Sequence, residues 1–278
     1  MTIWQAIILG VVQGLTEFLP VSSSAHLAVM PFLTGWQDQG LQFDIAVHFG
    51  TLLAVIAFFF RDWVQIIAQG FGLDPARFLA KEKIDSDVAR NPMLLWLLVA
   101  ATIPAGVVGL LWQDEIEQVG NNLWAIGTML ILVGLVMWMA ERASQRRRHL
   151  DTVSFADTAI IGVSQALAVI PGTSRSGITI SAGLFRNIDR YAAARFSFLL
   201  STPIIAGASA KNFLDMAGQG VADDTMTNFA VGILASAITG ALTIRFFLDF
   251  LRRKSLRFFV AYRIIFGIIV IALAFFRS

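Results

Sequence analysis

The sequence contains no cysteine, and this absence excludes several kinds of chemistry. Without a thiol, the chain forms no disulfide, holds no thiolate-bound zinc or iron–sulfur cluster and offers no cysteine nucleophile. Charged residues are also scarce, at 14% of the 278 residues, and the net charge is only +2. A net charge this small creates no field that would attract nucleic acid, so we expect no nucleic-acid partner.

Apolar residues are correspondingly abundant. Hydrophobic residues make up 56% of the chain, and the mean hydropathy is +0.71, outside the usual composition of soluble domains. The first residues lack the basic segment of a cleavable signal peptide, so we expect them to belong to the mature protein. The composition predicts an all-α integral membrane protein that forms one membrane domain over residues 1–278.

Six apolar stretches are long enough to cross a bilayer, which takes about 20 residues. The expected spans are 43–60, 92–112, 122–140, 196–212, 228–249 and 258–276. Two further apolar stretches, 3–35 and 155–185, are interrupted by the polar segments 20–24 and 171–177. Non-helical backbone at membrane depth is tolerated only where it is buried in protein or lines a wet cavity. Each interrupted stretch is therefore expected to form a re-entrant hairpin of two short helices.

The two interrupted stretches resemble each other in sequence. An eight-residue match places Gln13 on Gln165, and after a one-residue slip Ser23 falls on Ser174. Interrupted helices at matching positions of two halves are typical of a binding site within the membrane. The match predicts an internal repeat.

Basic residues indicate the orientation in the membrane, because cytoplasmic loops carry an excess of lysine and arginine. The connections 61–91, 141–153 and 252–257 are rich in basic residues and are expected to be cytoplasmic. The connections 113–121 and 213–227 contain acidic residues without a basic one and are expected outside.

Threading the spans through these assignments makes the first hairpin enter from outside and the second from inside. This is the pattern of an inverted-topology repeat whose hairpin tips meet near the middle of the membrane. The expected repeats are about 1–140 and 155–278, joined by a basic cytoplasmic loop at 141–154.

One carboxylate lies within the first apolar stretch. Glu17 follows Gln13 by four residues, so both share one face of a helix. A carboxylate at membrane depth is costly and normally faces a cavity, which favours a functional role for Glu17. The plainer alternatives are a protonated Glu17 that ties two helices together and a Gln13 that serves as a hydrogen bond between helices.

Three serines follow the proline of the first turn. Ser22, Ser23 and Ser24 predict a helix N-cap with free backbone N–H groups, and such helix ends bind anions. His26 lies about one helical turn after Ser23, so that the two can act as base and nucleophile, or His26 can itself attack. The alternative is an N-cap with a structural histidine nearby.

The second turn places an arginine among small polar residues. The guanidinium of Arg175 matches a phosphate group bidentately, and Ser174, Ser176 and Thr179 supply further donors. Gly177 permits close approach of the backbone. The pattern of a P-loop is absent, so ATP hydrolysis is not indicated. The alternative is that Arg175 extends to the membrane interface.

Residues 14–26 and 171–177 together resemble the bacterial undecaprenyl pyrophosphate phosphatase family, also called bacitracin-resistance proteins. The acidic motif of the family falls on Gln13 and Glu17, and the resemblance covers the whole chain. It implies a membrane hydrolase that removes the terminal phosphate of undecaprenyl pyrophosphate, recycles the lipid carrier for cell-wall synthesis and confers bacitracin resistance.

The resemblance also implies a cofactor and a location. The family requires a divalent cation, Mg²⁺ or Ca²⁺, and Glu17 is the expected ligand. Because the first acidic position here is Gln13, the motif keeps one carboxylate, which puts a two-carboxylate metal site in doubt. The implied location is the bacterial inner membrane, among membrane lipids, with the active site open to the periplasmic face. The oligomeric state stays open, with a homodimer as one option.

On this interpretation the catalytic residues are Glu17, Ser23, His26 and Arg175, and the substrate-binding residues are Gln13, Ser22, Ser174, Ser176, Gly177 and Thr179. Ser23 is the preferred nucleophile and His26 the proton shuttle; a phosphohistidine at His26, or water activated by Glu17, are the alternatives. A different class of function, a lipid or anion transporter or flippase, would use the same inverted-repeat site. His48 begins a span and could approach the site, but such a residue is more often interfacial, and it is left out of the predicted site.

Overall fold

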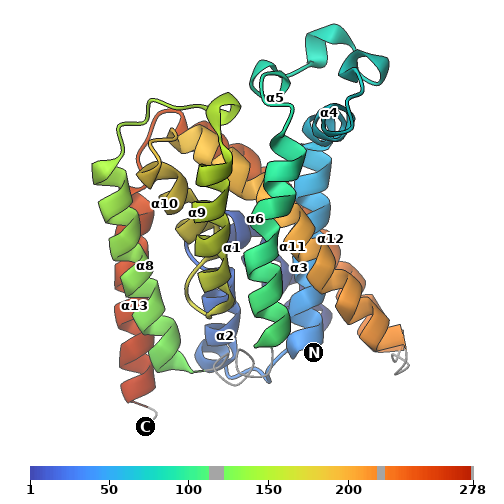
Figure 1. Ribbon diagram of the computed structural model, residues 1–278. Helices are drawn as coiled ribbons and strands as arrows, with labels where there is room; N and C mark the ends of the chain where they lie inside the picture. Colours follow the sequence, from blue (N-terminus) through green and yellow to red (C-terminus); the bar gives the residue numbers. More distant parts are fainter. Residues whose placement is uncertain (113–121, 218–222, 277–278) are drawn as a thin grey trace.

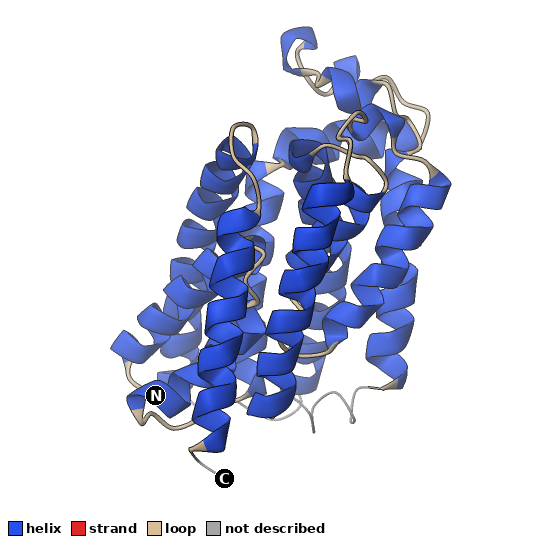
Figure 2. Ribbon diagram, turned by 90° about the vertical axis from the view of Figure 1, so that its left-hand side faces the viewer, coloured by secondary structure: helices blue, strands red, loops and turns tan. Residues whose placement is uncertain are grey.

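The computed structural model describes residues 1–112, 122–217 and 223–276, and in these ranges every regular element is a helix (Figure 2). Within these ranges, six helices are long and apolar enough to span a membrane. The spans are Leu41–Phe58 (α3), Leu94–Leu111 (α6), Leu123–Ala143 (α8), Arg190–Lys211 within α11 (Arg190–Ala217), Met226–Leu251 within α12 (Asp223–Leu251) and Arg257–Phe275 (α13). The predicted all-α membrane protein with six spans is confirmed.

The two interrupted stretches each form a pair of short helices. The first pair is α1 (Ile3–Phe18) and α2 (Ser23–Thr34), and the second is α9 (Phe155–Ala166) and α10 (Arg175–Phe185), preceded by a 3-10 turn at Leu167–Val169. In Figure 1 the first pair starts at the lower end of the bundle, beside the N-terminus, whereas α9 descends from the upper end before the chain turns back into α10. The hairpins therefore enter the bundle from opposite ends.

The basic connections gather at the upper end of the bundle in Figure 1. This end holds α4 (Phe60–Gly70) and α5 (Ser86–Ala89), as well as 3-10 turns at Pro75–Arg77, Lys81–Lys83 and Leu150–Thr152. Both chain termini lie at the opposite end. Of the two connections expected outside, 113–121 lies outside the described residues. The other, 213–227, is largely helical, because α11 extends to Ala217 and α12 begins at Asp223, and only 218–222 lie outside the described residues.

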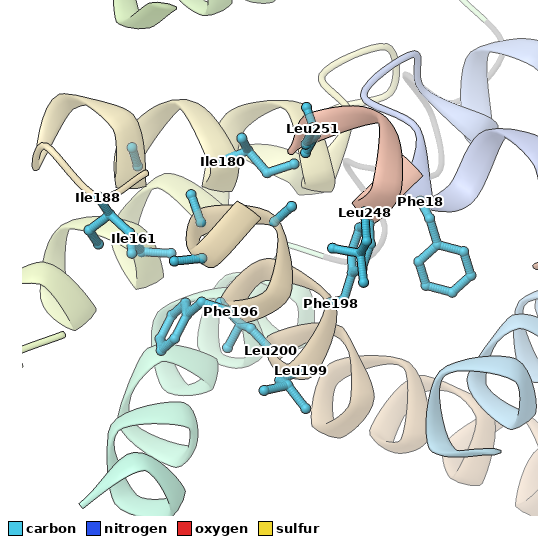
Figure 3. Close-up of a cluster of buried hydrophobic side chains, with 14 of the residues drawn as sticks. Phe18, Ile161, Ile180, Ile188, Phe196, Phe198, Leu199, Leu200, Leu248 and Leu251 are labelled. Atoms are coloured by element: carbon cyan, nitrogen blue, oxygen red, sulfur yellow. The ribbon is translucent and has the colours of Figure 1, made fainter. Parts of the chain in front are cut away.

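Helix α11 runs through the centre of the main apolar cluster (Figure 3). Its side chains Phe196, Phe198, Leu199 and Leu200 are completely buried and meet residues from α9, α10 and α12. The ring of Phe18, the last residue of α1, packs edge-on against Phe198 with 5.2 Å between centroids. Close packing of this kind stabilises helix association in lipid, where the hydrophobic effect between helices is absent. It also sets the position of the first turn.

Small residues allow the first helix of each hairpin to approach a span closely. A Cβ atom on Gly14 would lie 1.9 Å from the hydroxyl of Thr239 and 2.7 Å from the backbone oxygen of Ser236. At the corresponding face of α9, a Cβ on Gly162 would lie 2.8 Å from the backbone oxygen of Ala101. Glycine at these contacts brings α1 against α12 and α9 against α6. The boundaries of the two repeats stay a prediction.

A buried acid holds the base of the second hairpin. Asp157, in the first turn of α9, accepts hydrogen bonds from Arg148 at 2.9 and 2.6 Å and from Arg186 at 2.7 Å. It also accepts from the backbone N–H and the hydroxyl of Ser154, which caps the helix. These bonds join the loop after α8, the start of α9 and the end of α10. The base of the hairpin is therefore anchored by charge as well as by packing.

Candidate active site

The tips of the two hairpins meet at an ion pair. The carboxylate of Glu17, near the end of α1, accepts a hydrogen bond at 2.6 Å from the guanidinium of Arg175, the first residue of α10. The two side chains are only 8% and 12% exposed. The structure thus brings together the two charged residues that the sequence places at separate turns.

The second oxygen of the same carboxylate carries three further contacts. Glu17 Oε2 accepts hydrogen bonds from the hydroxyl of Ser23 at 2.7 Å and from the amide nitrogen of Gln13 at 3.1 Å. The Nε2 atom of His48 lies 3.5 Å from this oxygen. Glu17 is therefore the centre of the site, and His48, interpreted from the sequence as interfacial, belongs to it.

The two turns end in the same unusual cap. Ser22 has φ +72° and its side chain accepts from the backbone N–H of Ala25, while Ser174 has φ +69° and accepts from the N–H of Gly177. A positive φ is costly for a residue with a side chain and persists only where the surroundings enforce it. Both helices thus begin with a preorganised N-terminus directed at the centre of the bundle.

The matching caps correct the predicted alignment of the hairpins. Ser22 pairs with Ser174, at the same offset of 152 residues that relates Gln13 to Gln165. The predicted one-residue slip, which placed Ser23 on Ser174, is therefore wrong, because the cap geometry and not the proline defines the equivalent positions. Ser23 corresponds instead to Arg175, and both reach Glu17 from the first position of their helices.

Two predicted substrate-binding hydroxyls are engaged with the protein. Ser176 donates to the backbone oxygen of Leu19 at 3.0 Å, which joins the two tips directly. Thr179 lies 2.7 Å from the hydroxyl of Ser197, and Arg175 donates to the backbone oxygen of Ser197 at 3.0 Å. Thr179, which also donates to the backbone oxygen of Arg175 at 2.7 Å, therefore helps to hold Arg175 in place. Ser197 was missed because a serine within an apolar span carries no distinctive signal.

His26 makes contacts other than the predicted one. Its Nδ1 donates to the backbone oxygen of Ser22 at 2.7 Å, and its Nε2 accepts from the hydroxyl of Tyr262 at 2.7 Å. The imidazole also stacks on the ring of Phe266, with 4.5 Å between centroids. The hydroxyl of Ser23 is bonded to Glu17 instead. The predicted pairing of Ser23 with His26 is thus not formed in this arrangement, because His26 reaches back over its own helix N-terminus.

A buried arginine joins the two turns from behind. Arg263 of α13 is completely buried and donates to the backbone oxygens of Pro20 in the first turn and of Gly172 and Thr173 in the second, at 3.2, 2.8 and 3.0 Å. It also donates to the backbone oxygen of Leu130 in α8 at 3.2 Å. An arginine inside an apolar span is itself a functional signal, and this signal was available in the sequence.

The second turn also requires a glycine. Gly172 has φ +88°, and a Cβ atom there would lie 2.5 Å from the backbone oxygen of Ile126. The backbone of the turn consequently lies directly against α8, in reach of Arg263. A larger residue at position 172 would push the turn away from α8 and from Arg263.

One unpartnered oxygen beside Glu17 suits a divalent cation. Within the described residues, Glu17 belongs to no group of three or more acidic, histidine or cysteine side chains that could enclose a metal ion. The Oε1 atom of Gln13, however, is buried and has no hydrogen-bond partner in the described structure. Mg²⁺ is commonly bound by one or two carboxylates together with substrate phosphates. The donor set fits a cation of this kind, completed by a ligand.

Comparison with known proteins connects this geometry to a family. The family model of the bacitracin resistance protein BacA matches residues 6–269. The undecaprenyl-diphosphatase of Moorella thermoacetica is 42% identical over 277 residues, which are 100% of both chains. Similar matches are the undecaprenyl-diphosphatase of Rubrobacter xylanophilus, 44% identical over 97% of both chains, and undecaprenyl-diphosphatase 2 of Stutzerimonas stutzeri, 44% identical over 98% of both. These matches include both hairpins.

Proposed function

The chain belongs to the bacitracin resistance protein BacA family, and we propose that it is an undecaprenyl-diphosphatase. It removes the terminal phosphate of undecaprenyl pyrophosphate and so recycles the lipid carrier for cell-wall synthesis, which confers resistance to bacitracin. The observation that carries this proposal is the meeting of Ser23 and Arg175 on the buried carboxylate of Glu17.

The charge of the site suits a diphosphate. Two helix N-termini, capped by Ser22 and Ser174, direct backbone N–H groups toward the tips, and helix N-termini favour anions. Arg175 adds a fixed positive charge with a planar fork of donors that matches phosphate oxygens. Phosphoryl transfer depends mainly on positioning and on neutralising charge, and these are the properties of the two tips.

Ser23 is the nucleophile in this proposal. As its oxygen bonds to the terminal phosphorus, its proton passes to Glu17, which already accepts that hydrogen at 2.7 Å. The bond from the terminal phosphorus to the bridging oxygen breaks, and undecaprenyl phosphate leaves. Water then attacks the phosphoserine while Glu17 returns the proton to the serine oxygen, so that inorganic phosphate is released and the serine hydroxyl is restored. The alternatives are attack by His26 and attack by water that Glu17 activates. A Ser23→Ala variant distinguishes them from the serine route, because only the serine route needs the Ser23 hydroxyl.

A divalent cation is part of the proposal. Glu17 and the unpartnered amide oxygen of Gln13 would hold it, together with oxygens of the diphosphate. When bound, it would neutralise charge on the transferred phosphate.

The proposed orientation places the basic end of the bundle in the cytoplasm of a bacterial inner membrane. The three basic connections lie at one end, as the positive-inside rule requires. The hairpin of α1 and α2, which carries Glu17 and Ser23, then enters from the periplasmic side. On this basis the site opens to the periplasmic face, and the polyprenyl chain lies along the apolar helix surfaces facing the lipid.

The test is release of inorganic phosphate from a polyprenyl pyrophosphate by the detergent-purified protein, with and without a chelator. We expect release that depends on a divalent cation and is lost in an Arg175→Ala variant. Hairpins entering from opposite sides are also found in transporters. No phosphate release by correctly folded protein, together with movement of the lipid across vesicles, would establish the transporter function in place of the hydrolase.

A further inference from the structure

His48 reaches the centre of the site from the span α3. Its Nε2 atom lies 3.5 Å from Glu17 Oε2, and its side chain is 29% exposed, against 8% for Glu17. The other charged groups of the site, Glu17 and Arg175, lie beside the hairpin tips. His48 instead belongs to a spanning helix, about two helical turns from its start.

The hydrogen bonding of the ring shows which nitrogen carries the proton. Nδ1 of His48 lies 2.7 Å from the backbone oxygen of Asp44, and a carbonyl oxygen can only accept, so Nδ1 carries the hydrogen. In the neutral ring, Nε2 therefore presents a lone pair toward Glu17 Oε2. A ring protonated on both nitrogens would instead donate from Nε2 to this oxygen, so the 3.5 Å contact suits either an ion pair or a metal ion held between the two atoms.

Gln13, which is bonded to Glu17, adds a third acceptor. Its amide nitrogen donates to Glu17 Oε2 at 3.1 Å, while its amide oxygen is buried and has no partner among the described residues. A buried polar atom without a partner is costly and commonly marks a site for an unseen ligand. The side chain that already contacts Glu17 Oε2 thus carries a further possible ligand atom.

The separation of these atoms suits a metal ion. Nitrogen and oxygen ligands lie about 2.1 Å from ions such as Mg²⁺ or Zn²⁺, so two ligands of one ion are at most about 4.2 Å apart. The 3.5 Å between His48 Nε2 and Glu17 Oε2 is within this limit. Arg175 occupies the other oxygen, Oε1, so a cation at Oε2 leaves the ion pair intact and shares its atom with the hydrogen bonds from Ser23 and Gln13.

We propose that His48 Nε2 is a direct ligand of the divalent cation, beside the oxygens of Glu17 and Gln13. The cation site is then a mixed set of one nitrogen and two oxygens, with its remaining positions left to water or phosphate. Imidazole suits transition metals better than Mg²⁺ or Ca²⁺, so this set binds Mn²⁺, Co²⁺ or Zn²⁺ more tightly than either. The proposal deepens the cation assignment of the proposed function, yet its test needs no substrate.

The experiment uses Mn²⁺ alone with the full-length, detergent-purified protein and pulsed electron paramagnetic resonance. A nitrogen bound directly to Mn²⁺ produces a ¹⁴N hyperfine coupling, which becomes a ¹⁵N coupling when histidine is isotopically labelled. The chain has three histidines, at positions 26, 48 and 149, so three single variants assign the signal completely. We expect His48→Gln to lose the coupling and to bind Mn²⁺ about tenfold or more weakly, whereas His26→Gln and His149→Gln keep both.

Persistence of the coupling in His48→Gln, or its absence from the wild-type protein with Mn²⁺ bound, would overturn the proposal. If His48→Gln does not fold, the other two variants still decide the question. Coupling retained in both leaves His48 as the ligand, and loss in either assigns it elsewhere. Phosphate release is measured separately, so an inactive protein that shows the coupling would refute the proposed hydrolase without affecting the metal ligand.

Discussion

Replacing Arg263 by lysine tests the connection between the two hairpin turns. The guanidinium spreads its donors over both turns and over α8, with distances of 3.2 Å to Pro20, 2.8 Å to Gly172 and 3.2 Å to Leu130. Lysine carries its three donors on one nitrogen and can serve only one of these places well. At least two hydrogen bonds from a charged group are lost.

Each such bond contributes about 1.5–3 kcal/mol, so Arg263→Lys is expected to lower the free energy of unfolding by about 3–6 kcal/mol. For a chain of this size, that loss corresponds to a fall in Tm of roughly 6–24 °C. The turns also position Ser23 and Arg175 relative to each other, and a displacement of about 1 Å between reacting groups costs on the order of a hundredfold in rate. We therefore expect kcat to fall by about a hundredfold, with a smaller change in KM.

Thermal unfolding in detergent and phosphate release from the polyprenyl pyrophosphate, measured on the same preparations, provide the assay. Arg257→Lys is the matched control, because this arginine begins the same helix and is exposed. An Arg263→Lys protein with the Tm and turnover of the wild type would refute the reasoning. In that case the buried guanidinium would not be what holds the two turns together.

Four further predictions concern single positions. Arg175→Lys lowers kcat/KM about tenfold or more, equivalent to about 1.4 kcal/mol, because lysine loses the fork; an unchanged rate would mean that the fork is not used. Ser23→Ala abolishes phosphate release, and near-normal turnover would exclude the serine route. Gly172→Ala lowers Tm more than Gly35→Ala, since both have a positive φ but only Gly172 faces a backbone oxygen of α8; equal effects would contradict the clash. The hydrogen bond to Asp189 raises the pKa of His149 above its ordinary value. The His149–Asp189 pair therefore stabilises the folded state below about pH 6.5, and this stabilisation is lost as the pH rises through the pKa of the folded state. Hydrogen exchange of the 141–154 loop, corrected for intrinsic rates, should show more opening at high pH, and His149→Gln should remove this pH dependence.

The hydropathy of the chain was sufficient to predict most of the architecture. Spans such as 122–140 and 258–276 are continuous apolar stretches, and the structure has helices at Leu123–Ala143 and Arg257–Phe275. The hairpins were predictable for the same reason, because a polar turn within an apolar stretch must be buried in protein. The alignment of the turns was less accurate. It followed the prolines, whereas the equivalence of Ser22 and Ser174 depends on backbone angles that the sequence alone does not show.

The sequence by itself determined that this is a helical membrane protein with two polar turns, and that Glu17 and Arg175 are costly enough at membrane depth to require a function. Only the tertiary structure decided which groups touch them. Ser23 bonds to Glu17 and not to His26, and His48 joins the site from a separate span. Hydropathy and helical periodicity act along one segment at a time, whereas these contacts depend on how helices from distant parts of the chain cross and rotate against one another.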